Sequence, residues 1–260
     1  MRRFVSVEEA GDGIIHVGRR MYERGYVASN DGNVSVRVSE DRILVTPTGM
    51  SKGFLTRSDL VMVDMAGRKV SGKREPTSEV KMHLRAYELR EDVGAVSHAH
   101  PPYATAYAVA GIPLEECILP EVILTIGSVP LARYGTPSTE EVPKSIEEVV
   151  RRSDAFLLKN HGVMTVGPDI LSAYHKLETV EHFAHISFIA GQLGRVKPLT
   201  GQEVEKLMGL REHLGIKGPY PGCVESGACS IEDSTDRTRL VKAIVEEVVK
   251  ILREGKHALD

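Results

Sequence analysis

Two histidines separated by one residue end an apolar run near the middle of the chain, in Val96-Ser97-His98-Ala99-His100. Side chains two residues apart in a strand point to the same side, so His98 and His100 can direct two imidazoles at one metal ion. The following Pro101 and Pro102 cannot donate to a sheet but are well suited to start a helix. This pattern predicts a metal site at the end of a strand.

Catalytic zinc usually takes three protein ligands and leaves one position open. His161 offers the third ligand, because it stands in a turn between two apolar runs that read as strands. Glu79 offers a carboxylate immediately before a helix with apolar periodicity. The residues alone leave other interpretations open: a single histidine is commonly a packed or surface residue, and Thr77-Ser78-Glu79 is also typical of a helix cap.

Three segments carry glycines or hydroxyls that are suited to hold a phosphate. Glycine lets the backbone approach an anion closely, and a helix N-terminus favours negative charge. Ordinary turns have the same sequences, so a turn without a ligand is the alternative. The candidate phosphate residues are Gly32, Asn33, Thr48, Gly49, Thr77 and Ser78.

The elements that must position these side chains alternate between helices and short strands. Helices are predicted over 8–24, 78–90, 103–110, 139–152 and 170–193, and strands over 33–38, 42–46, 60–64 and 93–100, around 124, and over 129–131, 155–158 and 163–166. This alternation predicts a layered α/β domain with a mixed sheet.

Composition excludes some classes of function. The chain has 260 residues, enough for one sizeable core, and its formal net charge is −3. This charge argues against general nucleic-acid binding, and no apolar run is long enough to cross a membrane. Without a signal-peptide pattern, we expect a cytoplasmic protein. The three cysteines have no metal-ligand or disulfide-framework spacing, which predicts ordinary thiols with an uncertain redox role for Cys223 and Cys229.

Five separated segments follow one another in the order and spacing typical of a known family. They are Asp31 to Arg37, Ile43 to Lys52, Pro76 to His83, Val96 to Tyr107 and Leu157 to Gly167. With these segments the chain resembles the class II aldolase and adducin family over about residues 7–194.

The resemblance implies a three-layer α/β/α sandwich with a mixed, largely antiparallel central sheet, formed by residues 1–217. It implies a homotetramer with fourfold symmetry and active sites at subunit interfaces. The implied metal is zinc, with Mn2+, Co2+ and Fe2+ as alternatives, and its implied ligands are Glu79, His98, His100 and His161. The implied phosphate ligands are the six candidate residues named above.

The implied activity is a metal-dependent carbon–carbon lyase acting on a phosphorylated sugar. Its expected substrate is a ketose 1-phosphate, with L-fuculose 1-phosphate as the leading candidate. Cleavage would proceed through an enediolate to dihydroxyacetone phosphate and an aldehyde such as lactaldehyde. Glu79 is expected to exchange the proton. The alternatives are a dehydratase acting on methylthioribulose 1-phosphate, a 4-epimerase, a decarboxylating relative, and a non-catalytic adducin-like binding module.

One departure from the family concerns the proton donor. The family's aldolase has a tyrosine after the helix that follows the first histidines, whereas residues 118–123 contain none. Glu121 and Tyr134 are candidate substitutes, and the sequence favours neither. The departure leaves the aldehyde and the stereochemistry open.

The end of the chain has a different character. Residues 218–233 read as a linker, and residues 234–260 read as a helix with one apolar stripe, capped by Ser234-Thr235-Asp236. One interpretation is a tethered helix that docks on its own oligomer. The other is an encapsulation peptide that binds a shell protein and leads the enzyme into a bacterial microcompartment.

Overall fold

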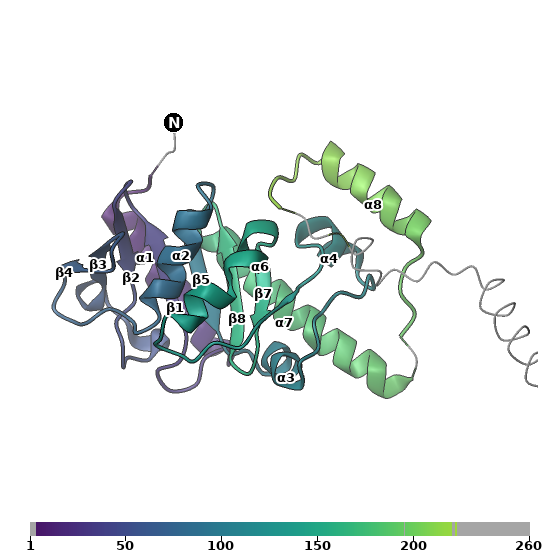
Figure 1. Cartoon of the computed structure of the whole chain (residues 1–260), viewed down its shortest axis with the longest axis horizontal. Coiled ribbons are helices and arrows are strands. Elements are labelled where there is room, and N and C mark those ends of the chain that lie inside the picture. The colour runs from purple at the N-terminus through teal and green to yellow at the C-terminus, as the bar shows by residue number, and fades with distance from the viewer. Residues whose placement is uncertain (1–3, 195, 220–221, 223–260) are drawn as a thin grey trace, which may run out of the picture.

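The computed structural model describes residues 4–194, 196–219 and 222 and places an eight-stranded sheet at its centre (Figure 1). The strand order is β4-β3-β2-β1-β5-β8-β7-β6. The strands are β1 Asn33–Arg37, β2 Arg42–Val45, β3 Val61–Asp64, β4 Lys69–Ser71, β5 Ala95–Ala99, β6 Leu131–Ala132, β7 Ala155–Leu158 and β8 Gly162–Gly167. Only β6 and β7 pair in parallel, so the predicted mixed, largely antiparallel sheet is confirmed.

Helices cover both faces of this sheet. The helices are α1 Val7–Glu23, α2 Val80–Leu89, α3 Pro102–Ala110, α4 Pro120–Thr125, α5 Glu141–Ser145, α6 Glu147–Arg152, α7 Ile170–Leu193 and α8 Gly201–His213, with two short 3-10 turns at Lys52–Phe54 and Arg57–Asp59. One apolar core joins the sheet to α1, α3 and α7, and the other joins it to α2, α5 and α6 (Figure 1). The three-layer sandwich is therefore confirmed.

The two longest helices begin at side-chain caps that the sequence shows. Ser6 and Glu9 form a reciprocal capping box at the start of α1, and the Asp169 carboxylate accepts a hydrogen bond from the Ser172 backbone N–H at the start of α7. Ile14, Val17 and Met21 form the buried stripe of α1, which follows the helical period.

Some expected elements were wrong. The strand expected around residue 124 is helix α4, because Pro120 starts a helical turn and a short apolar run does not distinguish the two structures. The helix expected over 139–152 is divided into α5 and α6 at Ile146. Strand β4 and helix α8 were not predicted. Cys117 is disulfide-bonded, so the expectation of an ordinary thiol is wrong for this residue.

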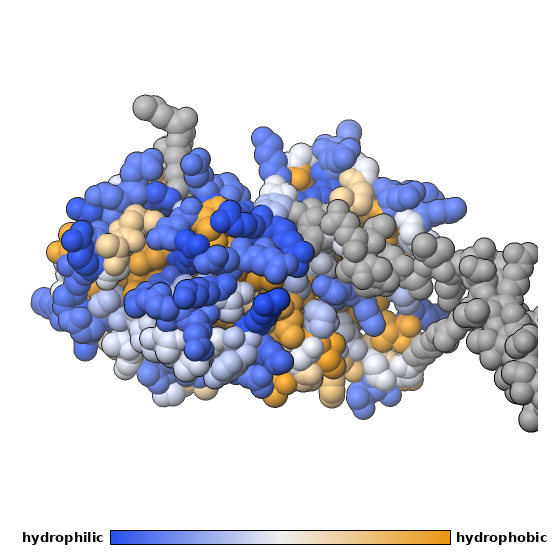
Figure 2. Space-filling model, in the orientation of Figure 1, coloured by the Kyte–Doolittle hydropathy of each residue, from blue (hydrophilic) through white to orange (hydrophobic). Residues whose placement is uncertain are grey.

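In the part of the chain that the structure describes, no helix is both long and apolar enough to cross a membrane. Apolar side chains gather on the surface over α3 and the adjoining part of α7 (Figure 2). The predicted C-terminal helix over 234–260 and most of the predicted linker lie outside the described residues.

Candidate metal centre and active site

His98 is the fully buried member of the predicted ligand set. It lies near the end of β5, between β1 and β8, where its cross-strand neighbours are Asn33 and Met164. Its Nδ1 lies 2.8 Å from the backbone carbonyl oxygen of Val163. A carbonyl only accepts, so Nδ1 carries the proton and the Nε2 lone pair faces the site.

His100 and His161 approach the same point from two chain reversals. The His100 backbone N–H donates to the Tyr26 carbonyl oxygen just after β5 ends, before the prolines that start α3. His161 stands in the tight turn between β7 and β8, where Asn160 has a positive φ of 56°. Asparagine tolerates this left-handed backbone better than most residues, which explains how so short a turn can present His161.

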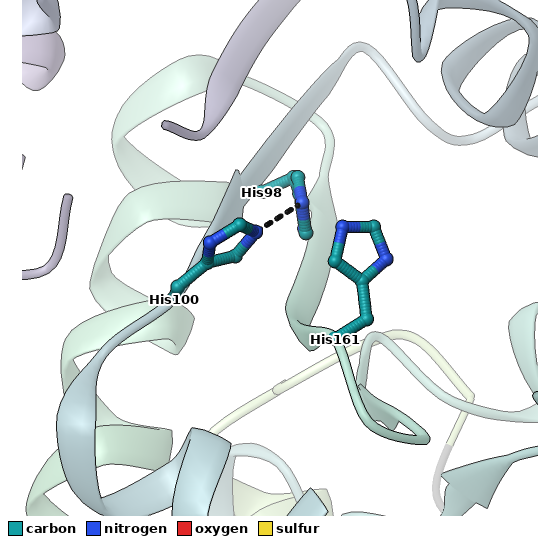
Figure 3. A group of neighbouring side chains, drawn as sticks. All are labelled: His98, His100 and His161. Carbon is teal, nitrogen blue, oxygen red and sulfur yellow. Dashed lines mark hydrogen bonds between the residues drawn. The ribbon is translucent and has the colours of Figure 1, made fainter. Parts of the chain in front are cut away.

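The three histidine rings converge (Figure 3). One ring nitrogen from each lies within 4.8 Å of the others, and the Nε2 atoms of His98 and His100 are 3.2 Å apart. A metal ion bound by ring nitrogens at about 2.0–2.1 Å requires such a separation. The three predicted histidine ligands are thus brought together.

Glu79 completes the cluster. Its Oε1 lies 3.0 Å from His161 Nε2, and its Oε2 lies 3.4 Å from His98 Nε2. Glu79 occupies the N-cap position of α2, but no side chain makes a capping hydrogen bond there. The Glu79 backbone N–H donates to Thr77 Oγ1. The Glu79 carboxylate is therefore directed to the histidines, and the side-chain cap that was the alternative interpretation of Thr77-Ser78-Glu79 does not form.

Burial and charge act in opposite directions on these groups. Burial alone would raise the pKa of Glu79, but the charges of His98 and His161 outweigh it and hold that pKa far below its usual range. Burial would lower the pKa of His98, whereas the Glu79 carboxylate raises it above the usual value. Burial and the two neighbouring histidines lower the pKa of His100 to about 4.

The donor set fits a divalent metal such as zinc. The buried Oε1 of Glu79 lies 3.0 Å from His161 Nε2 but makes no hydrogen bond of good geometry. Burying a carboxylate oxygen with so little compensation is costly. A cation held by His98, His100 and His161 would lie beside this oxygen and compensate that cost. Three imidazoles with a nearby carboxylate are a common ligand set for catalytic zinc.

A chain of buried hydrogen bonds holds Glu79 from behind. Asn33 Nδ2 donates to Glu79 Oε2 at 2.7 Å, and Asn33 Oδ1 lies 2.5 Å from His83 Nε2. His83 Nδ1 lies 2.7 Å from Ser35 Oγ, which is 2.8 Å from the Tyr87 hydroxyl. Because the amide oxygen of Asn33 only accepts, His83 is protonated on Nε2 and accepts from Ser35.

The sequence motifs did not predict this chain of hydrogen bonds or a role for His83. Glu79, His83 and Tyr87 are four residues apart, which places them on one side of α2. That spacing was the available signal. Asn33 was expected to hold phosphate, but in the structure its side-chain amide is directed to Glu79.

The segments expected to hold phosphate lie side by side. The Thr48 backbone N–H donates to the Glu75 carbonyl oxygen, and the Thr77 N–H donates to the Thr46 carbonyl oxygen. Thr46 Oγ1 accepts from the Val34 N–H, next to Asn33. These contacts gather the candidate phosphate residues around the edge of the histidine site.

Glycine is favoured at both turns that are candidates for holding phosphate. Gly32 and Gly49 each have a φ of +69°, which L side chains rarely adopt. A Cβ at Gly32 would also lie 2.8 Å from the His98 carbonyl oxygen, whereas a Cβ at Gly49 would meet nothing within 4 Å. Backbone at Gly49 is therefore open to an approaching group.

The two candidate substitutes for the missing tyrosine lie on the surface. Glu121 is in the first turn of α4 and lines a cavity of about 570 Å³ together with Tyr103, His182 and His185. The Tyr134 side chain is 55% exposed. No described contact joins Glu121 or Tyr134 to the histidine cluster, so neither is assigned as proton donor.

Comparisons with known proteins find a matching family and named relatives. The class II aldolase and adducin N-terminal domain family matches residues 12–188. An L-fuculose phosphate aldolase of Methanococcus maripaludis is 36% identical over 179 residues, which are 69% of this chain and 96% of the relative. A 3-oxo-tetronate 4-phosphate decarboxylase of Haemophilus influenzae is 33% identical over 199 residues, 75% of this chain and 93% of the relative.

A solved structure of an L-fuculose 1-phosphate aldolase superposes with a TM-score of 0.74 at 30% sequence identity. The alignment covers 80% of this chain and 98% of that chain.

Proposed function

Because the chain belongs to the class II aldolase and adducin family, we propose that it is a metal-dependent lyase cleaving a ketose 1-phosphate, with L-fuculose 1-phosphate as the first substrate to test. The products would be dihydroxyacetone phosphate and an aldehyde such as lactaldehyde. The observation that carries the proposal is the convergence of His98, His100 and His161 on the buried Glu79 carboxylate.

Each group of the site has a part in this reaction. A bound divalent ion supplies Lewis-acid stabilisation of the negative charge that develops on substrate oxygens. Glu79 accepts or returns a proton, and its amide contact with Asn33 fixes the direction of the carboxylate. Backbone and hydroxyl groups around Gly32, Gly49 and Thr77 hold the phosphate, which orients the bond to be cleaved.

The decarboxylase relative supports a second candidate function. Loss of carbon dioxide from a 3-oxo acid, like cleavage of an aldol, leaves negative charge beside a carbonyl group. The same histidine cluster and phosphate segments can serve both reactions. The dehydratase and epimerase alternatives use a metal site of the same kind.

The experiment measures metal content and both reactions on one preparation. Metal is determined by mass spectrometry, dihydroxyacetone phosphate release is followed from L-fuculose 1-phosphate, and carbon dioxide release from 3-oxo-tetronate 4-phosphate. We expect His100→Ala to lose bound metal and more than ~100-fold of the activity, because outer-shell changes alone typically cost 10–100-fold. His213→Ala, in the last turn of α8, is the matched control.

Cleavage by the wild-type protein that fails in His100→Ala supports the aldolase. Carbon dioxide release without cleavage assigns the decarboxylase instead. Bound metal with neither product points to the dehydratase or epimerase, and a protein without metal affinity contradicts a metal-dependent lyase.

A further inference from the structure

Lys52 is buried beside the phosphate segments. Only 2% of its surface is exposed, whereas lysine is almost never fully buried unless it is paired. Its Nζ donates to two backbone carbonyls, Asn30 at 2.7 Å and Met50 at 2.6 Å. Two of the three N–H donors of the ammonium are thus used, and the third has no partner among the described residues.

The ammonium has no ion-pair partner among the described residues. Asp31 and Glu79 act on it through space, but no described carboxylate lies within 4.0 Å of Nζ. Burial lowers the pKa of Lys52 to about 8, so it is still protonated at neutral pH. A buried cation without a counter-charge is costly, which indicates that its partner is a ligand.

The two carbonyls identify where that ligand would bind. Asn30 precedes the Gly32 turn and Met50 follows the Gly49 turn, so Lys52 lies between the two glycine turns. An open depression of about 540 Å³ lies over the Gly49 turn and reaches Asn30, whose carbonyl oxygen accepts from Lys52; its lining is Tyr22, Ser29, Asn30, Gly49, Ser51 and Phe54. Ser51 Oγ is also buried and has no hydrogen-bond partner among the described residues. It is the second polar group at this position, after the Lys52 ammonium, that a ligand could pair with.

We propose that Lys52 is the substrate-specificity residue that supplies the counter-charge for the phosphate dianion of the substrate. It also fixes the spacing of the two glycine turns through Asn30 and Met50. This inference rests on the proposed function, and it adds a cation to the six candidate phosphate residues, none of which is charged. A phosphate dianion suits this position because the backbone of the two neighbouring glycine turns can approach an anion closely while Lys52 supplies the opposite charge.

The test uses metal-loaded full-length protein and glycerol phosphate, which keeps the phosphate but lacks the substrate carbonyl. Binding is measured by calorimetry for the wild type, Lys52→Met and Lys52→Gln, with glycerol as the uncharged probe. We expect both variants to bind glycerol phosphate ~10- to 100-fold more weakly, the effect of losing a charged hydrogen bond. Metal content should not change, and Lys73→Met, at an exposed lysine, is the matched control.

The outcomes distinguish an effect of the Lys52 charge on phosphate binding from a purely structural effect of its hydrogen bonds. If Lys52 had only a structural role, any side chain that donates hydrogen bonds to the Asn30 and Met50 carbonyls would suffice. Wild-type affinity for glycerol phosphate in Lys52→Gln therefore overturns the proposal, even if Lys52→Met does not fold. Wild-type affinity in folded Lys52→Met also overturns it. Weakened binding in both variants supports it, whichever reaction the wild-type enzyme catalyses.

Absence of glycerol phosphate binding by the wild type would overturn this inference together with the phosphate part of the proposed function. If glycerol phosphate binds through Lys52 but L-fuculose 1-phosphate is not cleaved, only the proposed substrate fails. The two failures are therefore distinguishable.

Discussion

At the scale of single residues, Glu79 depends on groups that the sequence motifs do not include. The histidine cluster could be predicted because the spacing of His98 and His100 on a strand and the turn at His161 are local features. The support from His83, Ser35 and Tyr87 could not, because it arises only when β1 is placed beside α2. Lys52 was missed because its burial depends on the fold of the loops around Asn30 and Met50, which no local pattern shows.

His83 makes a testable contribution to acid stability. Burial lowers its pKa to about 3 from an ordinary value of 6.5. Between these values the unfolded chain binds a proton that the native protein does not, so stability rises with pH and is lost as the pH falls from 6.5 towards 3. The slope from this one group is at most ~1.4 kcal/mol per pH unit.

We expect His83→Gln to remove that part of the slope, because glutamine keeps a donor for Asn33 but does not titrate. Urea unfolding at pH 4, 5, 6 and 7 measures the free energy of unfolding of both proteins. His182→Gln, on α7, controls for loss of a histidine that is not held in this chain of hydrogen bonds. Equal pH slopes for His83→Gln and the wild type would contradict the assignment.

At the scale of elements, the sheet was largely predictable and its connections were not. The alternating or continuously apolar runs of β1, β2, β5, β7 and β8 predict strands from the sequence alone. Capping residues likewise predict where α1 and α7 begin. The short apolar run of α4 has no period that separates helix from strand. The meeting of the Thr48 and Glu75 segments is a long-range backbone contact that no local pattern shows.

Gly162 shows how closely two elements approach at the metal site. A Cβ there would lie 2.5 Å from the Ala99 carbonyl oxygen and 2.6 Å from His100 Cδ2. We expect Gly162→Ala to displace His100, to weaken metal binding by at least tenfold, and to cost ~1–3 kcal/mol of stability through overpacking. Metal titration and thermal unfolding measure the two effects.

Gly209→Ala is the matched control, because a Cβ at Gly209 in α8 meets nothing within 4 Å. It should leave metal affinity unchanged and stabilise the helix by ~0.5–1 kcal/mol. Wild-type metal affinity in Gly162→Ala would show that His100 does not depend on this close contact.

At the scale of the whole molecule, the surface over α3 and α7 has the features of a subunit contact. Phe188, Ile189 and Leu193 are 47%, 44% and 84% exposed, and Val109 of α3 is 56% exposed. The neighbouring Tyr103 ring lies 5.7 Å from the Phe188 ring and stacks on His185 at 3.8 Å. Contiguous exposed apolar groups commonly mark protein interfaces.

The tetramer, the division into residues 1–217 and a tail, and the shell-binding helix all stay predictions.

Replacing Phe188 with glutamate tests whether this surface joins subunits. A carboxylate placed in an apolar contact would be desolvated without a partner, so we expect Phe188→Glu to shift the assembly from tetramers to smaller species. Light scattering after size exclusion, at matched concentrations, measures the mass. Val70→Glu, at an equally exposed position on the edge strand β4, is the control and should leave the mass unchanged. Because His98, His100 and His161 all come from one chain, the metal content of the separated subunits should remain that of the wild type. A Phe188→Glu protein that keeps the wild-type mass, or a Val70→Glu protein that dissociates, would place the subunit contact elsewhere.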